Sequence, residues 1–122
     1  MDNRKIIFVY NANSNLFSMV SDYVHKAVAP STYNCNLCAL TYSNFGMKNQ
    51  WKEFIEKLDG EKVFLYRDDF IKKYPEHSTF ILPAIFIEKN GTLNELLTSA
   101  ELNSFHSLGE LQNALNKKLN KA

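Results

Sequence analysis

The hydrophobic residues of this chain recur with different spacings, and each spacing predicts an element. A continuous apolar run over residues 5–12 predicts a strand that is covered on both faces, as in the middle of a parallel sheet. Apolar residues three and four apart over 16–28 predict an amphipathic helix, which Pro30 prevents from continuing. The same spacing predicts a second helix over 48–58, and Gly60 supplies its C-terminal cap.

Shorter elements follow in the second half of the chain. The pattern predicts a strand over 63–66, a short helix over 68–74, and two strands over 82–88 and 92–98. The dipeptide Asn90-Gly91 separates the last two strands and is a strong hairpin signal, because both residues tolerate a positive φ.

A final helix is predicted over 108–119, where Ser107 and Glu110 fit a capping box. Residues 99–106 fit either a connector or an extra turn of helix. Early alternation of strand and helix implies parallel strands, and the hairpin adds antiparallel ones. We therefore expect a single α/β domain over 1–122, with a mixed sheet of 4–5 strands and helices on both faces.

Composition narrows the classes of partner. The chain has 122 residues and a formal net charge of +1, and it contains no long basic block, so we expect no nucleic-acid partner. No apolar run approaches the roughly 20 residues of a membrane span, and the start does not fit a secretory signal. We therefore expect a cytoplasmic protein with no membrane partner and no cofactor. The sequence does not indicate an oligomeric state.

The two cysteines, Cys35 and Cys38, carry the most specific chemistry, because they form a C-x-x-C pair. In a reducing compartment such a pair is more plausibly catalytic or metal-binding than a structural disulfide. Zinc needs roughly four ligands, and His25, His77 and His106 show no ligand spacing. Three interpretations stay open: a redox dithiol, half of a metal site, or two small buried residues.

A redox dithiol needs a thiolate, and a free cysteine with a pKa near 8.5 is mostly protonated at neutral pH. The nearest cationic side chains in the sequence are Lys26 and Lys48, so activation has to come from the backbone or from tertiary contacts. Residues three apart on a strand point to opposite faces. The two sulfurs can therefore act together only if 35–38 is a turn, which Asn34 and Asn36 favour.

The stretch "KVFLYRDDFIKKYPEHSTFILPAIFIEKNG" resembles the thioredoxin superfamily. It has the family's strand, a short helix ending near an aromatic residue, and a proline that opens a strand leading to a Gly turn. The resemblance implies a thioredoxin-like three-layer sandwich with a cis peptide bond at Leu82-Pro83. It also implies that Cys35 is the attacking thiol, Cys38 the resolving thiol and Pro83 a dock for substrate backbone. A disulfide-bearing protein or a small thiol would then be the partner.

The chain departs from that family at the dithiol itself. Asn36 and Leu37 separate the cysteines, where the family usually has Gly-Pro, and the pair does not directly follow the first strand. A second hypothesis is therefore a non-catalytic thioredoxin-fold binding module, whose cysteines are structural or form half of a metal site. Its surface would include Pro83 and the turn at 11–15.

The position of the cysteines decides between these hypotheses. The simplest path makes a short strand over 37–42, which places the cysteines at the opposite end of the sheet from Pro83, roughly 17–20 Å away. The other path carries the chain back through 29–34 in extended form and places both features at one end. We favour the first path, because residues 39–46 begin a helix poorly.

Overall fold

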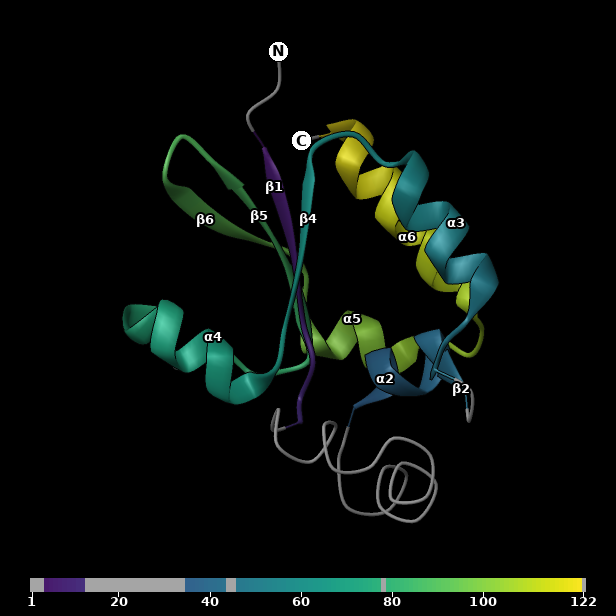
Figure 1. The fold of residues 1–122 in the computed structure, drawn as a ribbon, viewed down its shortest axis with the longest axis horizontal. Helices are drawn as coiled ribbons and strands as arrows, with labels where there is room; N and C mark the ends of the chain where they lie inside the picture. Colours follow the sequence, from purple (N-terminus) through teal and green to yellow (C-terminus); the bar gives the residue numbers. More distant parts are fainter. Residues whose placement is uncertain (1–3, 13–34, 44–45, 78, 122) are drawn as a thin grey trace.

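The computed structural model describes residues 4–12, 35–43, 46–77 and 79–121. A mixed four-stranded sheet forms the centre of this part of the chain (Figure 1). Its strands, in spatial order, are β4 (Glu61–Leu65), β1 (Lys5–Val9), β5 (Ala84–Lys89) and β6 (Thr92–Leu97). β1 runs parallel to β4 and antiparallel to β5, and β6 is antiparallel to β5. The prediction of an α/β fold with a mixed sheet is confirmed.

Helices lie on both sides of this sheet (Figure 1). Among the described residues, one side carries four helices: α2 (Asn36–Thr41), α3 (Asn49–Lys57), α5 (Ser99–Ser104) and α6 (Leu108–Lys121). The other side carries α4 (Arg67–Lys73), which is followed by a 3-10 turn, Pro75–His77. A small two-stranded sheet, β2 (Tyr42–Ser43) with β3 (Gly46–Met47), joins α2 to α3. None of the helices within the described ranges is long and apolar enough to cross a lipid bilayer.

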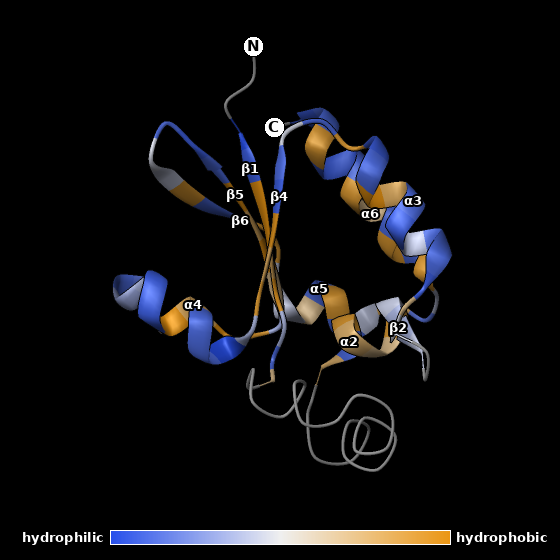
Figure 2. Cartoon of the chain, in the orientation of Figure 1, coloured by the Kyte–Doolittle hydropathy of each residue, from blue (hydrophilic) through white to orange (hydrophobic). Residues whose placement is uncertain are grey.

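The central strand β1 explains the continuous apolar run, because its two faces pack into two different clusters. Phe8 packs into the larger cluster, where its ring meets Trp51 edge-on at 5.7 Å. Ile7 and Val9 point the other way, into a smaller cluster with Phe70 of α4. Figure 2 shows the hydrophobic residues concentrated along the strands, with hydrophilic residues at the β5–β6 turn. A strand covered on both faces needs apolar residues throughout.

Most elements predicted from residue 48 onward are confirmed, with ends shifted by a few residues. The hairpin turn has the expected geometry, with φ of 51° at Asn90 and 81° at Gly91. The ambiguous segment 99–106 contains a helix, α5. Its N-cap Thr98 accepts a hydrogen bond from the Glu101 amide at 3.2 Å. The helix predicted over 16–28 lies outside the described residues.

The predicted strand over 37–42 is wrong, because residues 36–41 form the helix α2. Thr41, a residue that suited a strand, is accommodated by a hydrogen bond from its hydroxyl to the Leu37 carbonyl at 2.7 Å. Leu37 itself is fully buried in the larger cluster. Tertiary burial of this face outweighs the weak helix propensity of the segment.

Candidate functional site

The two cysteines lie together at the start of α2. Cys35 is the N-cap residue and Cys38 lies in the first turn, so 35–38 is a turn, as joint action of the two sulfurs requires. Their Cα atoms are 5.3 Å apart, and the two sulfurs lie at disulfide distance. Both residues belong to the larger core cluster, with 7% of Cys35 and 3% of Cys38 exposed to solvent.

Two backbone amides point at the sulfur of Cys35. The Cys38 amide donates a hydrogen bond to this sulfur at 3.3 Å, and the Asn11 amide donates another at 3.4 Å. Asn11 lies just beyond the end of β1, so the second contact ties the start of α2 to the carboxyl end of the central strand. Hydrogen bonds to a charged sulfur favour its ionised form. The two amides are donors that would favour a thiolate at Cys35 in the reduced chain.

A guanidinium group supports the loop that carries one of these donors. Arg67 donates from Nη1 to Oδ1 of Asn11 at 3.0 Å, and its own amide donates to the Ala12 carbonyl at 2.9 Å. Arg67 is the first residue of α4, which follows β4 at the same end of the sheet. Sequence reasoning missed this residue, because it is 56 positions away from Asn11 in the chain.

Pro83 lies at the same end of the sheet as the cysteines. It directly precedes β5, whose first residue Ala84 is in register with Val9, two residues before Asn11. The path that we favoured from the sequence, with the cysteines at the opposite end, is therefore wrong. The physical reason is that residues 36–41 form a helix rather than a strand, so the chain does not climb the sheet through those residues.

The segment that leads into β5 presents backbone and one large apolar side chain. The Leu82–Pro83 peptide bond has cis geometry. Pro83 is buried and Leu82 is half-buried. Ile81, by contrast, exposes 73% of its surface. A partner at this edge would therefore meet the backbone around residue 82 and the side chain of Ile81 before it could touch the proline ring.

Asn36, between the two cysteines, braces the turn against a second helix. Its side-chain amide donates to the Leu102 carbonyl at 2.7 Å and to the Phe105 carbonyl at 2.9 Å. These carbonyls belong to the end of α5, where helical partners run out. The sequence indicated that Asn36 favours a turn, but it gave no signal for this long-range brace.

A group of tyrosine rings closes the large cluster at this end of the sheet. The ring of Tyr10 lies 5.6 Å from that of Tyr42 and 5.8 Å from that of Tyr66, centroid to centroid. Burial raises the pKa of the Tyr10 phenol well above its ordinary value of 10.0, and the neighbouring Tyr42 adds to the rise. Burial also raises the pKa of Tyr42 and Tyr66. The three phenols therefore stay neutral at physiological pH.

Metal-binding chemistry has little support in the part of the chain that the structure describes. No group of three or more His, Cys, Asp or Glu side chains there is placed to hold a metal ion. His25 lies outside the described residues. The cysteine pair is thus two potential ligands without an intramolecular third among those residues.

Comparison of the chain with protein-family models, with curated proteins and with solved structures finds no match. The geometry around Cys35, Cys38 and Pro83 is therefore the basis for the function proposed below.

Proposed function

We propose that this chain is a small thiol–disulfide redox protein with a divergent thioredoxin-like fold. The carrying observation is that two cysteine sulfurs lie at disulfide distance at the sheet end where Pro83 opens β5. The thioredoxin resemblance implies this combination: a dithiol at a helix start, beside a proline that begins a strand. The order of strands and helices from β4 to α6 supports the same proposal.

In the proposed reaction, the reduced protein transfers two electrons to a disulfide. The Cys35 thiolate attacks one sulfur of the substrate, which forms a mixed disulfide and releases the other substrate sulfur as a thiolate. Cys38 then loses its proton and attacks the Cys35 sulfur. This second step forms the Cys35–Cys38 disulfide and releases the second substrate sulfur as a thiolate, which takes up a proton. A small thiol reduces the protein again by the reverse exchange.

The surroundings of the two sulfurs support the assignment of roles. The sulfur of Cys35 accepts both the Cys38 and the Asn11 amide hydrogens, and Cys35 is also the more exposed of the pair. Amide donors stabilise the attacking thiolate of Cys35, and the substrate sulfur is the leaving group when Cys38 resolves the mixed disulfide. Cys38 lies deeper, where only an internal attack is required of it.

The substrate side of the proposal uses the segment before β5. Backbone near Pro83 would pair with the extended chain of a disulfide-bearing protein, and the exposed side chain of Ile81 would contact its apolar residues. A small thiol or small disulfide would need neither contact. A cytoplasmic location stays a prediction, and the dithiol form would predominate there.

One observation favours the second hypothesis, a non-catalytic binding module. Both cysteines are largely covered, and a buried cysteine pair is commonly inert. On that account the Cys35–Cys38 pair holds the start of α2 in place, and the Pro83 edge serves as a binding surface without chemistry.

The test is a disulfide-reduction assay with the native chain, Cys35→Ser and Cys38→Ser. Insulin and glutathione disulfide are the substrates, and thiol reactivity is followed against pH. We expect turnover by the native chain and none above background by either variant. Circular dichroism in reducing buffer serves as the folding control. Absence of turnover in a folded native chain, with cysteines that react only after denaturation, would support the binding module.

A further inference from the structure

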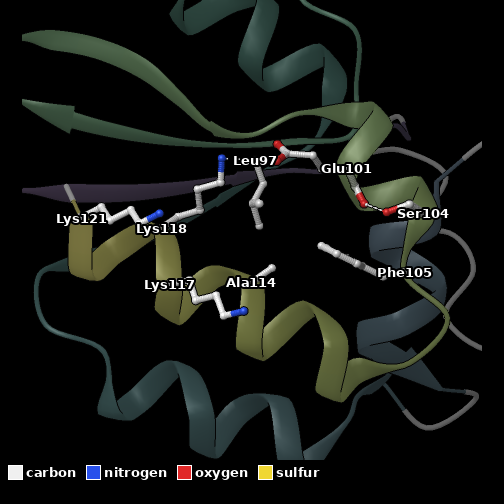
Figure 3. A pocket seen from close by; sticks show the side chains of 8 residues that line it. All are labelled: Leu97, Glu101, Ser104, Phe105, Ala114, Lys117, Lys118 and Lys121. Carbon is white, nitrogen blue, oxygen red and sulfur yellow. Dashed lines mark hydrogen bonds and ion pairs between the residues drawn. The ribbon is translucent and has the colours of Figure 1, made fainter.

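A cavity away from the cysteine pair opens between α5, the end of β6 and α6 (Figure 3). It encloses about 360 Å³. Leu97, Phe105 and Ala114 approach one another across its inner part in Figure 3, and they form an apolar floor. This volume lies at the small end of the range of roughly 300–1,000 Å³ that ligand pockets occupy. It suits a single small molecule better than a folded partner element.

Lysines surround the mouth of this cavity. Lys117, Lys118 and Lys121 line it from the last two turns of α6, and Glu101 is the sole acid of the lining. Glu101 is already neutralised, because its carboxylate pairs with Lys118 at 3.3 Å and accepts the Thr98 amide hydrogen at 2.9 Å. Among the described residues, Lys117 and Lys121 have no acidic partner. The rim thus presents two uncompensated positive charges above an apolar floor.

We propose that this pocket binds an unbranched amphiphilic carboxylate, such as a medium-chain fatty acid anion. The alkyl chain would lie against Leu97, Phe105 and Ala114, and the carboxylate would lie at the rim between Lys117 and Lys121. Charge complementarity favours the anion, because a neutral apolar molecule would gain no ion pair with the two exposed ammonium groups. The small volume selects a single chain over a two-chain lipid.

Phe105 connects the pocket to the turn that carries the two cysteines. The carbonyl of Phe105 accepts the Asn36 amide hydrogen, while the Phe105 side chain lines the pocket. The carboxylate proposal does not depend on the redox proposal, since none of its contacts involves a sulfur. The experiments below therefore measure carboxylate binding and no thiol chemistry.

The first experiment is an NMR titration of the ¹⁵N-labelled full chain with hexanoate, octanoate and decanoate, all below their micellar concentrations. We expect saturable shifts centred on the amides of Phe105, Ala114 and Lys117. Affinity should rise by up to about fourfold for each added methylene until the chain fills the pocket. Octanol has the apolar chain without the charge, and acetate has the charge without the chain. Both should bind much more weakly than octanoate.

Substitutions then test the contacts. Replacing both free lysines (Lys117→Gln with Lys121→Gln) should weaken octanoate binding on the order of tenfold. The matched control is Lys72→Gln with Lys73→Gln, which removes two exposed neighbouring lysines from α4 on the other face of the sheet and should leave affinity unchanged. Ala114→Leu adds three carbons to the apolar floor and should weaken octanoate binding, with circular dichroism as the folding check.

Three results would each overturn the proposal. The first is chemical-shift changes that spread over the surface and do not saturate. The second is equal affinity for octanol and octanoate. The third is an equal loss of octanoate affinity when either pair of lysines is replaced. The lysine substitutions lie on exposed positions, so the conclusion does not depend on whether Ala114→Leu folds.

Discussion

The cysteine edge and the lysine-rimmed pocket border the same short helix, α5, but they are built in opposite ways. At the cysteine edge, fixed hydrogen bonds hold the reactive atoms: two amides point at one sulfur, and Asn36 braces the turn. At the pocket, an open apolar floor lies beneath exposed charged side chains. The first arrangement suits chemistry that needs exact positions. The second suits capture of a molecule by burial and charge, which salt should weaken.

The largest expected effect concerns the anchor of the cysteine edge. Leu37→Ala removes a fully buried side chain of α2, and we expect a loss of about 2–5 kcal/mol in the free energy of unfolding. Denaturation in reducing buffer, followed by the fluorescence of the single tryptophan Trp51, measures it. Ala39→Ser, on the exposed side of the same helix, should change stability by less than about 0.5 kcal/mol. Similar losses in both variants would mean that α2 is not anchored through Leu37.

The second-largest effect is expected at Asn36, whose side chain connects the cysteine edge to α5. Asn36→Ala removes the side-chain donor from the Phe105 carbonyl and from the Leu102 carbonyl, which keeps the Phe105 amide at 3.4 Å. We expect a loss of about 1–3 kcal/mol in the free energy of unfolding. The chemical shifts of Phe105 should also move, because its carbonyl is one of the acceptors. Asn103→Ala is the control, since the Asn103 side chain donates to the nearby Ser99 hydroxyl at 3.4 Å and bonds to no distant residue in the described part of the chain. An unchanged stability in Asn36→Ala would show that the two regions are independent.

The substrate edge can be tested without disturbing the fold. Ile81→Asp places a charge on the exposed residue that precedes Leu82–Pro83, and we expect roughly tenfold slower reduction of insulin. Reduction of glutathione disulfide, which is too small to need that contact, should be unchanged. Ile71→Asp alters the other exposed isoleucine, on α4, and serves as the matched control. If insulin and glutathione disulfide slow equally, Ile81 is not a docking contact.

The smallest expected change in stability comes from Glu101, at the rim of the pocket. The Thr98 backbone amide, aided by Lys118, lowers the pKa of Glu101 below its ordinary value of 4.5. The folded state therefore favours the ionised carboxylate, and this contribution is present above pH 4.5 and is lost as the pH falls through the lowered pKa. We expect Glu101→Gln to cost no more than about 1 kcal/mol at pH 7, because the pair with Lys118 is partly exposed.

That cost should shrink in acid, where the native side chain also becomes neutral. Denaturation curves of the native chain and Glu101→Gln at several pH values measure it. A difference that grows as the pH falls would contradict the assigned direction of the pKa shift.

Local patterns predicted the four strands of the central sheet and the longer helices α3 and α6, because each carries a recognisable pattern of apolar residues. β1 is a continuous apolar run, α6 has a leucine stripe, and Asn90-Gly91 marks the hairpin. The helix α2 was mispredicted because six residues give less than two turns, too few for a helical period to show. Its stability comes from partners far away in the sequence.

The same separation hid most of the site. The contacts of Asn36 span 66 and 69 residues, and that of Arg67 spans 56, so no short motif could reveal them. The cysteine pair and Pro83 could be identified from the sequence, because cysteine and proline are rare in this chain and each has a known chemical or backbone role. Their placement at one end of the sheet depends on where α2 lies, which the sequence pattern did not establish.

The most direct test of the redox proposal is the formation of a mixed disulfide at one cysteine of the folded chain. Reduced Cys38→Ser and reduced Cys35→Ser are each mixed with glutathione disulfide at neutral pH, and adducts are followed by mass spectrometry. We predict a stoichiometric adduct on Cys35 in the first variant and much slower reaction of Cys38 in the second. Adducts that appear only in denaturant, or at equal rates on both cysteines, would contradict the proposal.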